Sequence, residues 1–116
     1  MNKRNETFEL YDLKVEVTHG EKPFVCSHVE GEHFEVIGEN LVFPQKGQRI
    51  SMYSLAGLLP ILPAKQRITH SNDWMTTDAD IACPDPHCGA LFHITRTRKR
   101  TFKHSDVSVI PLEIQT

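Results

Sequence analysis

The sequence lacks any long hydrophobic run. Its longest apolar stretch, residues 55–64, is about half the length of a membrane-spanning helix and contains two prolines. The first ten residues are polar and charged, without the apolar centre of a secretory signal. We therefore expect a cytoplasmic protein with no membrane partner.

Cysteine is scarce, with three residues in a chain of 116. An odd count without an export signal argues against a disulfide-stapled scaffold. In a reducing cytoplasm, paired thiols more often bind metal or carry out redox chemistry. The Walker loop, the Gly-x-Gly-x-x-Gly fingerprint and the His-Glu-x-x-His motif are absent, so the commonest signs of nucleotide binding and of zinc proteases are missing.

The composition is that of a folded chain, with 39% hydrophobic and 24% charged residues and a net charge of −2. Its length fits one domain, and no repeat or low-complexity linker divides it. We expect a flexible N-terminus over residues 1–9 and a single α+β domain over residues 10–116.

Short apolar runs predict the elements of this domain. Residues 11–18 alternate apolar and polar side chains, which predicts a half-buried strand with Asp12 on its polar side. Residues 52–62 have helical spacing, and Pro60 predicts a break in that helix. Further strands are predicted at residues 24–26, 34–37, 41–43, 89–94 and 107–114. Together they predict a mainly antiparallel sheet with one short helix around residues 52–62.

The cysteines and two histidines fall into two clusters. In the second, Cys83-Pro84-Asp85-Pro86-His87-Cys88-Gly89 resembles the Cys-Pro-x-Cys-Gly knuckles of zinc ribbons and rubredoxin-like sites, with two additional residues. Gly89 would supply the positive φ that a knuckle needs. A four-residue spacer between cysteines also occurs in plant-type ferredoxins.

The first cluster is Cys26-Ser27-His28. In an extended chain Cys26 and His28 point to the same side and can reach one ion. With Cys83 and Cys88 they would form a Cys₃His site, a tetrahedral zinc set. His87 is the alternative fourth ligand, and Asp85 is a weaker oxygen alternative.

The chain contains the string YDLKVEV at residues 11–17, Cys26-Ser27-His28 with Gly31 and Phe34, Leu59-Pro60, residues 63–67, Asp73-Trp74-Met75, and Cys83-Pro84-Asp85-Pro86 with Cys88. Together these segments resemble a family of short prokaryotic proteins, about 90–120 residues long, that have no assigned activity. The resemblance implies a bacterial or archaeal cytoplasmic origin and places the three cysteines in the motif positions of that family.

Three functions fit these residues. The first is a small metal-binding protein with a structural zinc, which contributes directly to folding. The second is an iron–sulfur or mononuclear iron protein that uses the same cysteines. The third is a thiol or redox enzyme with Cys26 as nucleophile, so whether the protein catalyses a reaction stays open. Glu30, Glu32 and Glu35 alternate as on an exposed strand face and suggest no catalytic pair.

Residues 96–100 form a basic run, with Phe102 and Lys103 close behind. Basic residues interleaved with an aromatic can bind nucleic acid. A net charge of −2 and a single such run instead favour a solvated hairpin between two strands. Partners stay open between another protein, a small molecule and a second copy of this chain.

Overall fold

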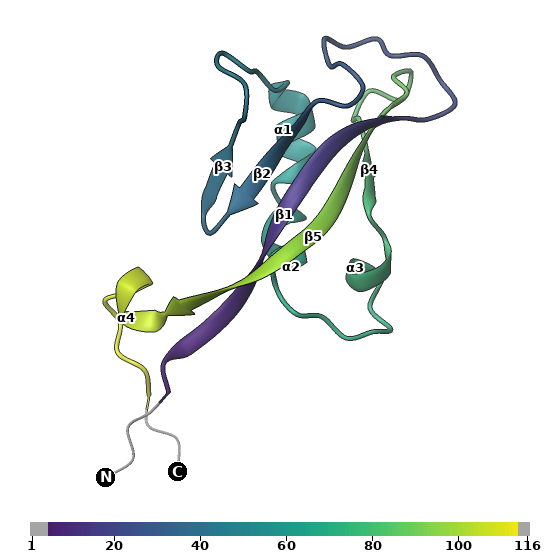
Figure 1. Ribbon diagram of the computed structural model, residues 1–116. Coiled ribbons are helices and arrows are strands. Elements are labelled where there is room, and N and C mark those ends of the chain that lie inside the picture. Colours follow the sequence, from purple (N-terminus) through teal and green to yellow (C-terminus); the bar gives the residue numbers. More distant parts are fainter. Residues whose placement is uncertain (1–4, 114–116) are drawn as a thin grey trace.

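The fold is built on one five-stranded antiparallel sheet, with the strand order β3-β2-β1-β5-β4 (Figure 1). The structure is a computed structural model that describes residues 5–113. Its strands are β1 (Thr7–His19), β2 (His33–Ile37), β3 (Asn40–Val42), β4 (Asp80–Ala82) and β5 (Ala90–Lys103). Its helices over these residues are α1 (Met52–Leu58), α2 (Leu62–Gln66), α3 (Trp74–Thr77) and α4 (His104–Val107). The α+β class and the antiparallel sheet are confirmed, and the expected single helix becomes several short ones.

Strands β1 and β5 form a long twisted ribbon that extends past the other strands and ends beside α4 (Figure 1). Their pairing runs from Thr7 opposite Lys103 to His19 opposite Ala90. Strand β1 thus begins before residue 10, and residues 7–9 of the expected loose terminus belong to the sheet because β5 offers them partners. The other end of the ribbon carries the loops that hold the cysteines.

The core lies between one face of the sheet and helices α1 and α2 (Figure 1). Alternation along β1 turns Leu13, Val15 and Val17 into this core and leaves Lys14 and Glu16 half-buried on the other face. Burying an aliphatic or aromatic side chain of this size stabilises a protein by about 1.5–3 kcal/mol. The buried cluster consists of Leu13, Val15, Val17, Phe34, Val36, Leu58, Leu62, Phe92 and Ile94.

Asp12 departs from the predicted alternation. The pairing of β1 with β5 shifts register between Asp12 and Leu13, so both side chains are buried, with 3% and 0% exposed. A bulge of this kind adds a residue on one strand and reverses the facing of what precedes it. Arg100 compensates the buried charge, since its Nε and Nη2 donate to the two carboxylate oxygens at 3.1 and 2.8 Å.

The predicted helix over residues 52–62 divides at its prolines. The Ser51 hydroxyl caps α1 by accepting from the amide of Tyr53 at 3.2 Å, and the helix ends before Pro60. Pro63 lies in the first turn of α2, where its missing N–H leaves no hydrogen bond unmade. The break turns α2 so that both short helices cover the sheet.

Lys65 of α2 is a buried lysine that holds the next helix in place. Only 4% of it is exposed, and its Nζ donates to the carbonyls of Met75 and Asp78 at the end of α3. Burial lowers the pKa of Lys65 below its ordinary value, and the nearby Arg96 guanidinium lowers it further.

Several predicted elements are wrong. Residues 24–26 form no strand, because their polar groups face the 83–89 turn. The basic run at 96–100 is the interior of β5 and not a hairpin. Residues 107–114 do not form the predicted strand. Val107 is the last residue of α4, and residues 108–113 form no strand. Residue 114 lies outside the described residues. Strand β4 was not predicted, since Ile81 alone supplies no pattern.

Within residues 5–113, no helix is long and apolar enough to cross a bilayer.

Candidate functional site

Two loops meet at one end of the β1–β5 ribbon (Figure 1). The first, residues 20–32, connects β1 to β2, and the second, residues 83–89, connects β4 to β5. Three hydrogen bonds to carbonyl oxygens join them: Gly20 N to Gly89 O at 2.9 Å, Gly89 N to Pro23 O at 3.0 Å, and Lys22 Nζ to Pro86 O at 2.8 Å. Residues far apart in the sequence are therefore held side by side.

Gly89 allows the loops to touch. A Cβ at this position would lie 1.7 Å from the carbonyl oxygen of Lys22 and 2.4 Å from its carbonyl carbon. The glycine does not adopt a positive φ, so the conformational reason predicted for it is wrong. Glycine is required because no side chain fits between the two backbones.

All three cysteines meet at this junction. Sγ of Cys26 and Sγ of Cys88 lie 3.4 Å apart, although 62 residues separate them in the chain. Burial and the neighbouring Cys88 thiol raise the pKa of Cys83. All three are free thiols; Cys88 is buried and the other two are partly buried. The structure thus brings together the cysteines of both sequence clusters.

Backbone amides surround the sulfurs. Val25 N donates to Cys88 Sγ at 3.5 Å, and the backbone two residues after each cysteine, at His28, Asp85 and Ala90, lowers the pKa of that cysteine. Amide donors of this kind stabilise a thiolate over a thiol.

The thiols differ in acidity. Burial raises the pKa of Cys88, but hydrogen bonds from the backbones of Val25 and Ala90 and from the neighbouring thiols outweigh it, leaving the pKa below its ordinary value. Burial raises the pKa of Cys26 and of Cys83, and one backbone hydrogen bond to each offsets only part of this. Cys88 is therefore the first of the three to become a thiolate.

His28 is buried, and both of its ring nitrogens have polar neighbours. Its Nδ1 lies 2.8 Å from Oε1 of Glu32, and its Nε2 accepts from Ser51 N at 3.4 Å. The ring stands edge-on to Phe92, with centroids 5.3 Å apart. A carboxylate on Nδ1 fixes the tautomer and leaves the lone pair on Nε2, as in histidines that bind metals.

His87 occupies a different environment. Its side chain is 88% exposed, and its Nδ1 lies 3.5 Å from Oδ1 of Asp85. That carboxylate also accepts from the His87 amide at 2.9 Å, so Asp85 shapes the turn itself. Of the two predicted alternatives for a fourth ligand, only His28 is held in a defined orientation by its surroundings.

Two residues of the site were not predicted. Glu32, expected on an exposed strand face, accepts from the Val29 amide at 3.2 Å and contacts His28. Ser54 of α1 is buried beside the Cys83 thiol. The spacing of Glu32 four residues after His28 was the only signal, and it indicates a contact only if the loop turns back.

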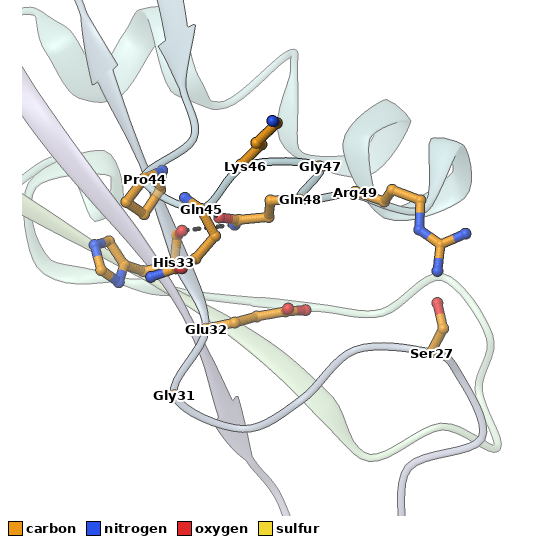
Figure 2. A pocket seen from close by; sticks show the side chains of 10 residues that line it. All are labelled: Ser27, Gly31, Glu32, His33, Pro44, Gln45, Lys46, Gly47, Gln48 and Arg49. Carbon is orange, nitrogen blue, oxygen red and sulfur yellow. Dashed lines mark hydrogen bonds between the residues drawn. The ribbon is translucent and has the colours of Figure 1, made fainter.

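A surface groove of about 550 Å³ lies next to the first loop (Figure 2). Glu32 projects into it, while Arg49 and Ser27 face each other at one end. Gln48 and His33 also line the groove, and Nε2 of Gln48 donates to His33 O at 2.7 Å. None of the three cysteines lines the groove, so it adjoins the thiol cluster only through Ser27 and Glu32.

The basic run on β5 makes internal contacts. Arg96 donates to the carbonyls of Lys65 and Arg67, each at 2.8 Å, and its guanidinium lies 4.7 Å from the ring centre of Tyr11. Arg100 neutralises Asp12, as described above. Two of the four basic side chains in the run therefore stabilise the fold.

No group of three or more histidine, cysteine, aspartate or glutamate side chains within residues 5–113 is already arranged around a common point for a metal ion. The contacts found are the Cys26–Cys88 pair, the adjoining Cys83 and the neighbouring His28–Glu32 pair. The resemblance to short prokaryotic proteins stays a prediction. In comparisons with known proteins, no family model, no curated protein and no solved structure is significantly similar to this chain.

Proposed function

We propose that this is a small metal-binding protein whose Cys26, Cys83 and Cys88 hold a structural zinc ion. The observation that carries the proposal is the 3.4 Å contact between Cys26 Sγ and Cys88 Sγ, with backbone amides directed at the sulfurs. Zinc bound here would link the 20–32 loop to the 83–89 turn, and its binding energy would stabilise the fold.

The spacing of the sulfurs supports a shared ion. Two thiolates bound to one tetrahedral zinc at about 2.3 Å lie about 3.8 Å apart, whereas a disulfide holds its sulfurs about 2.0 Å apart. The observed 3.4 Å is much closer to the first value. To bind the same ion, Cys83 and the fourth ligand would have to move toward the Cys26–Cys88 pair.

His28 is the proposed fourth ligand. Glu32 holds its Nδ1, so Nε2 carries the lone pair, and the 3.4 Å hydrogen bond from Ser51 N is a weak competitor for that lone pair. Three thiolates and one imidazole give a closed Cys₃His site, which has no open position for substrate and so favours a structural role.

Metal analysis of tag-free protein purified without oxygen tests the proposal. We expect one zinc ion per chain, no acid-labile sulfide and no visible absorbance. Replacing Cys26, Cys83 or Cys88 by serine should each lower zinc occupancy and thermal stability together. His87→Ala is the matched control, because His87 lies on the same turn with an 88% exposed side chain. Full zinc occupancy in all three serine variants would exclude this site.

His28→Ala and His33→Ala separate the fourth ligand from its neighbours. His33 begins β2 and lines the groove, with no contact to the cysteines. We expect His28→Ala to weaken zinc binding and His33→Ala to leave it unchanged. Equal binding in both variants would remove His28 from the site while leaving the three cysteines in place.

A dithiol redox function is the second candidate. Cys88, whose pKa is lowered, lies in contact with Cys26, whose pKa is raised. Such a difference suits thiol–disulfide exchange, in which one thiolate attacks a disulfide and another sulfur leaves as a thiolate. Protein that purifies without zinc but forms a reversible Cys26–Cys88 disulfide would favour this function. Iron with sulfide and a broad visible band would favour an iron–sulfur protein instead.

A further inference from the structure

Ser54 is a buried hydroxyl without an ordinary hydrogen bond. The residue is 2% exposed, and its Oγ has no hydrogen-bond partner of normal geometry within residues 5–113. Leaving a buried hydroxyl unpaired costs about 1–3 kcal/mol, so such groups usually serve a partner. Alanine at this place in a helix would fill nearly the same space without that cost.

Ser54 lies on the part of α1 that packs against the second cysteine turn. Helix α1 packs on the second cysteine turn, since a Cβ built on Gly57 would lie 3.5 Å from Cγ of Pro84. The side chain of Ser54, one helical turn earlier, reaches the thiol of Cys83. Cys83 also packs against the hydrophobic core, so water cannot easily replace the hydroxyl there.

We propose that Ser54 is a positioning residue of the metal site, which donates its hydroxyl hydrogen to Sγ of Cys83 once that sulfur is a metal-bound thiolate. The sulfur of a neutral thiol is a weak hydrogen-bond acceptor. A thiolate is a much stronger acceptor. Zinc binding would thus complete the hydrogen bonding of α1 as well as joining the two loops.

This inference rests on the proposed zinc site and concerns its affinity. Removing hydrogen-bond partners of metal ligands commonly weakens metal binding by about 10–100-fold. We expect Ser54→Ala to bind zinc about tenfold more weakly than the unaltered protein, measured by competition with a chromophoric chelator. The metal-free variant should melt at the same or a higher temperature, since an unpaired buried hydroxyl has been removed.

Ser51→Ala is the matched control. It removes a hydroxyl from the start of the same helix, where Ser51 Oγ caps α1 at the Tyr53 amide. If Ser54 acted only by stabilising α1, Ser51→Ala would weaken zinc binding at least as much. We expect it to lower the melting temperature instead, with a smaller effect on zinc affinity than Ser54→Ala.

Cobalt replacing zinc gives a spectroscopic test. Loss of a hydrogen bond to a thiolate raises the energy of its lone pair, so the sulfur-to-cobalt charge-transfer band of Ser54→Ala should move to longer wavelength. The band of Ser51→Ala should not move. An unchanged band together with unchanged zinc affinity in Ser54→Ala would overturn the role of Ser54 alone. Absence of any zinc or cobalt binding by the unaltered protein would overturn the metal site itself, and the role of Ser54 with it.

Discussion

The contact between Gly89 and Lys22 gives the most direct stability test of the loop junction. In Gly89→Ala the new Cβ would lie 1.7 Å from Lys22 O, a distance that real structures do not show. The two loops must therefore move apart by about 1.3 Å merely to bring that distance from 1.7 to 3.0 Å. A shift of this size breaks the backbone bonds from Gly89 N to Pro23 O and from Gly20 N to Gly89 O.

The expected magnitude follows from those two bonds. Gly89 is buried, and its N–H and its carbonyl oxygen would each lose a partner; at about 1–3 kcal/mol for each buried group left unpaired, Gly89→Ala should lower the free energy of unfolding by about 4 kcal/mol. That is a large part of the 5–15 kcal/mol typical of a whole domain. The same shift separates Val25 N from Cys88 Sγ, so zinc binding should weaken as well.

Urea unfolding followed by circular dichroism, with a chelator present, measures the stability change apart from metal. Gly57→Ala is the control, since its Cβ would lie 3.5 Å from Pro84, an ordinary contact. Gly57 is the last residue but one of α1, so Gly57→Ala should be neutral or stabilising by up to about 1 kcal/mol. A loss below about 1 kcal/mol in Gly89→Ala, with zinc affinity retained, would refute the close packing of the two loops.

Two further predictions concern titration and oxidation. Burial holds the pKa of Lys65 below its ordinary value, so between that lowered pKa and about 10.4 the unfolded chain binds more protons and the free energy of unfolding rises with pH. Urea unfolding at several alkaline pH values should show that the free energy of unfolding rises less with pH in Lys65→Met than in the unaltered protein. An equal rise in both proteins would contradict the effect of burial on Lys65. In metal-free protein, hydrogen peroxide should oxidise Cys88 to a sulfenic acid, which condenses with Cys26 to a disulfide and releases water. Peptide mapping by mass spectrometry should find that bond, and a dominant Cys83–Cys88 bond would show that the 3.4 Å pair does not direct oxidation.

The parts of the fold that follow from local pattern were predictable from the sequence. The alternation over residues 11–18 and the short apolar runs at residues 34–37 and 41–43 indicated β1, β2 and β3, because each depends on neighbours within a few residues. The break of the predicted helix was likewise indicated by Pro60. The strand predicted at residues 89–94 continues as β5 through the basic run, and this continuation was missed because its polar residues are paired by tertiary contacts, such as Arg100 with Asp12, that no local pattern reveals.

The candidate site was predictable in part for the same reason. Cysteine spacing pointed to Cys26, Cys83 and Cys88, since thiols are rare enough for their clustering to carry information. The pairing of Glu32 with His28 depends on how the first loop turns back, and the burial of Ser54 depends on how α1 meets the second loop. Neither arrangement leaves a signal in one sequence, because serine and glutamate occupy ordinary surface positions far more often.

Zinc K-edge X-ray absorption on the protein as purified tests the central claim most directly, because it reports the atoms bound to the metal. The proposed site predicts three sulfur ligands at about 2.3 Å and one nitrogen ligand at about 2.0 Å. Cys83→Ser should remove one sulfur from that shell. A zinc ion surrounded only by nitrogen and oxygen, or protein that carries no zinc when purified without oxygen, would contradict a thiolate zinc site at the meeting point of the two loops.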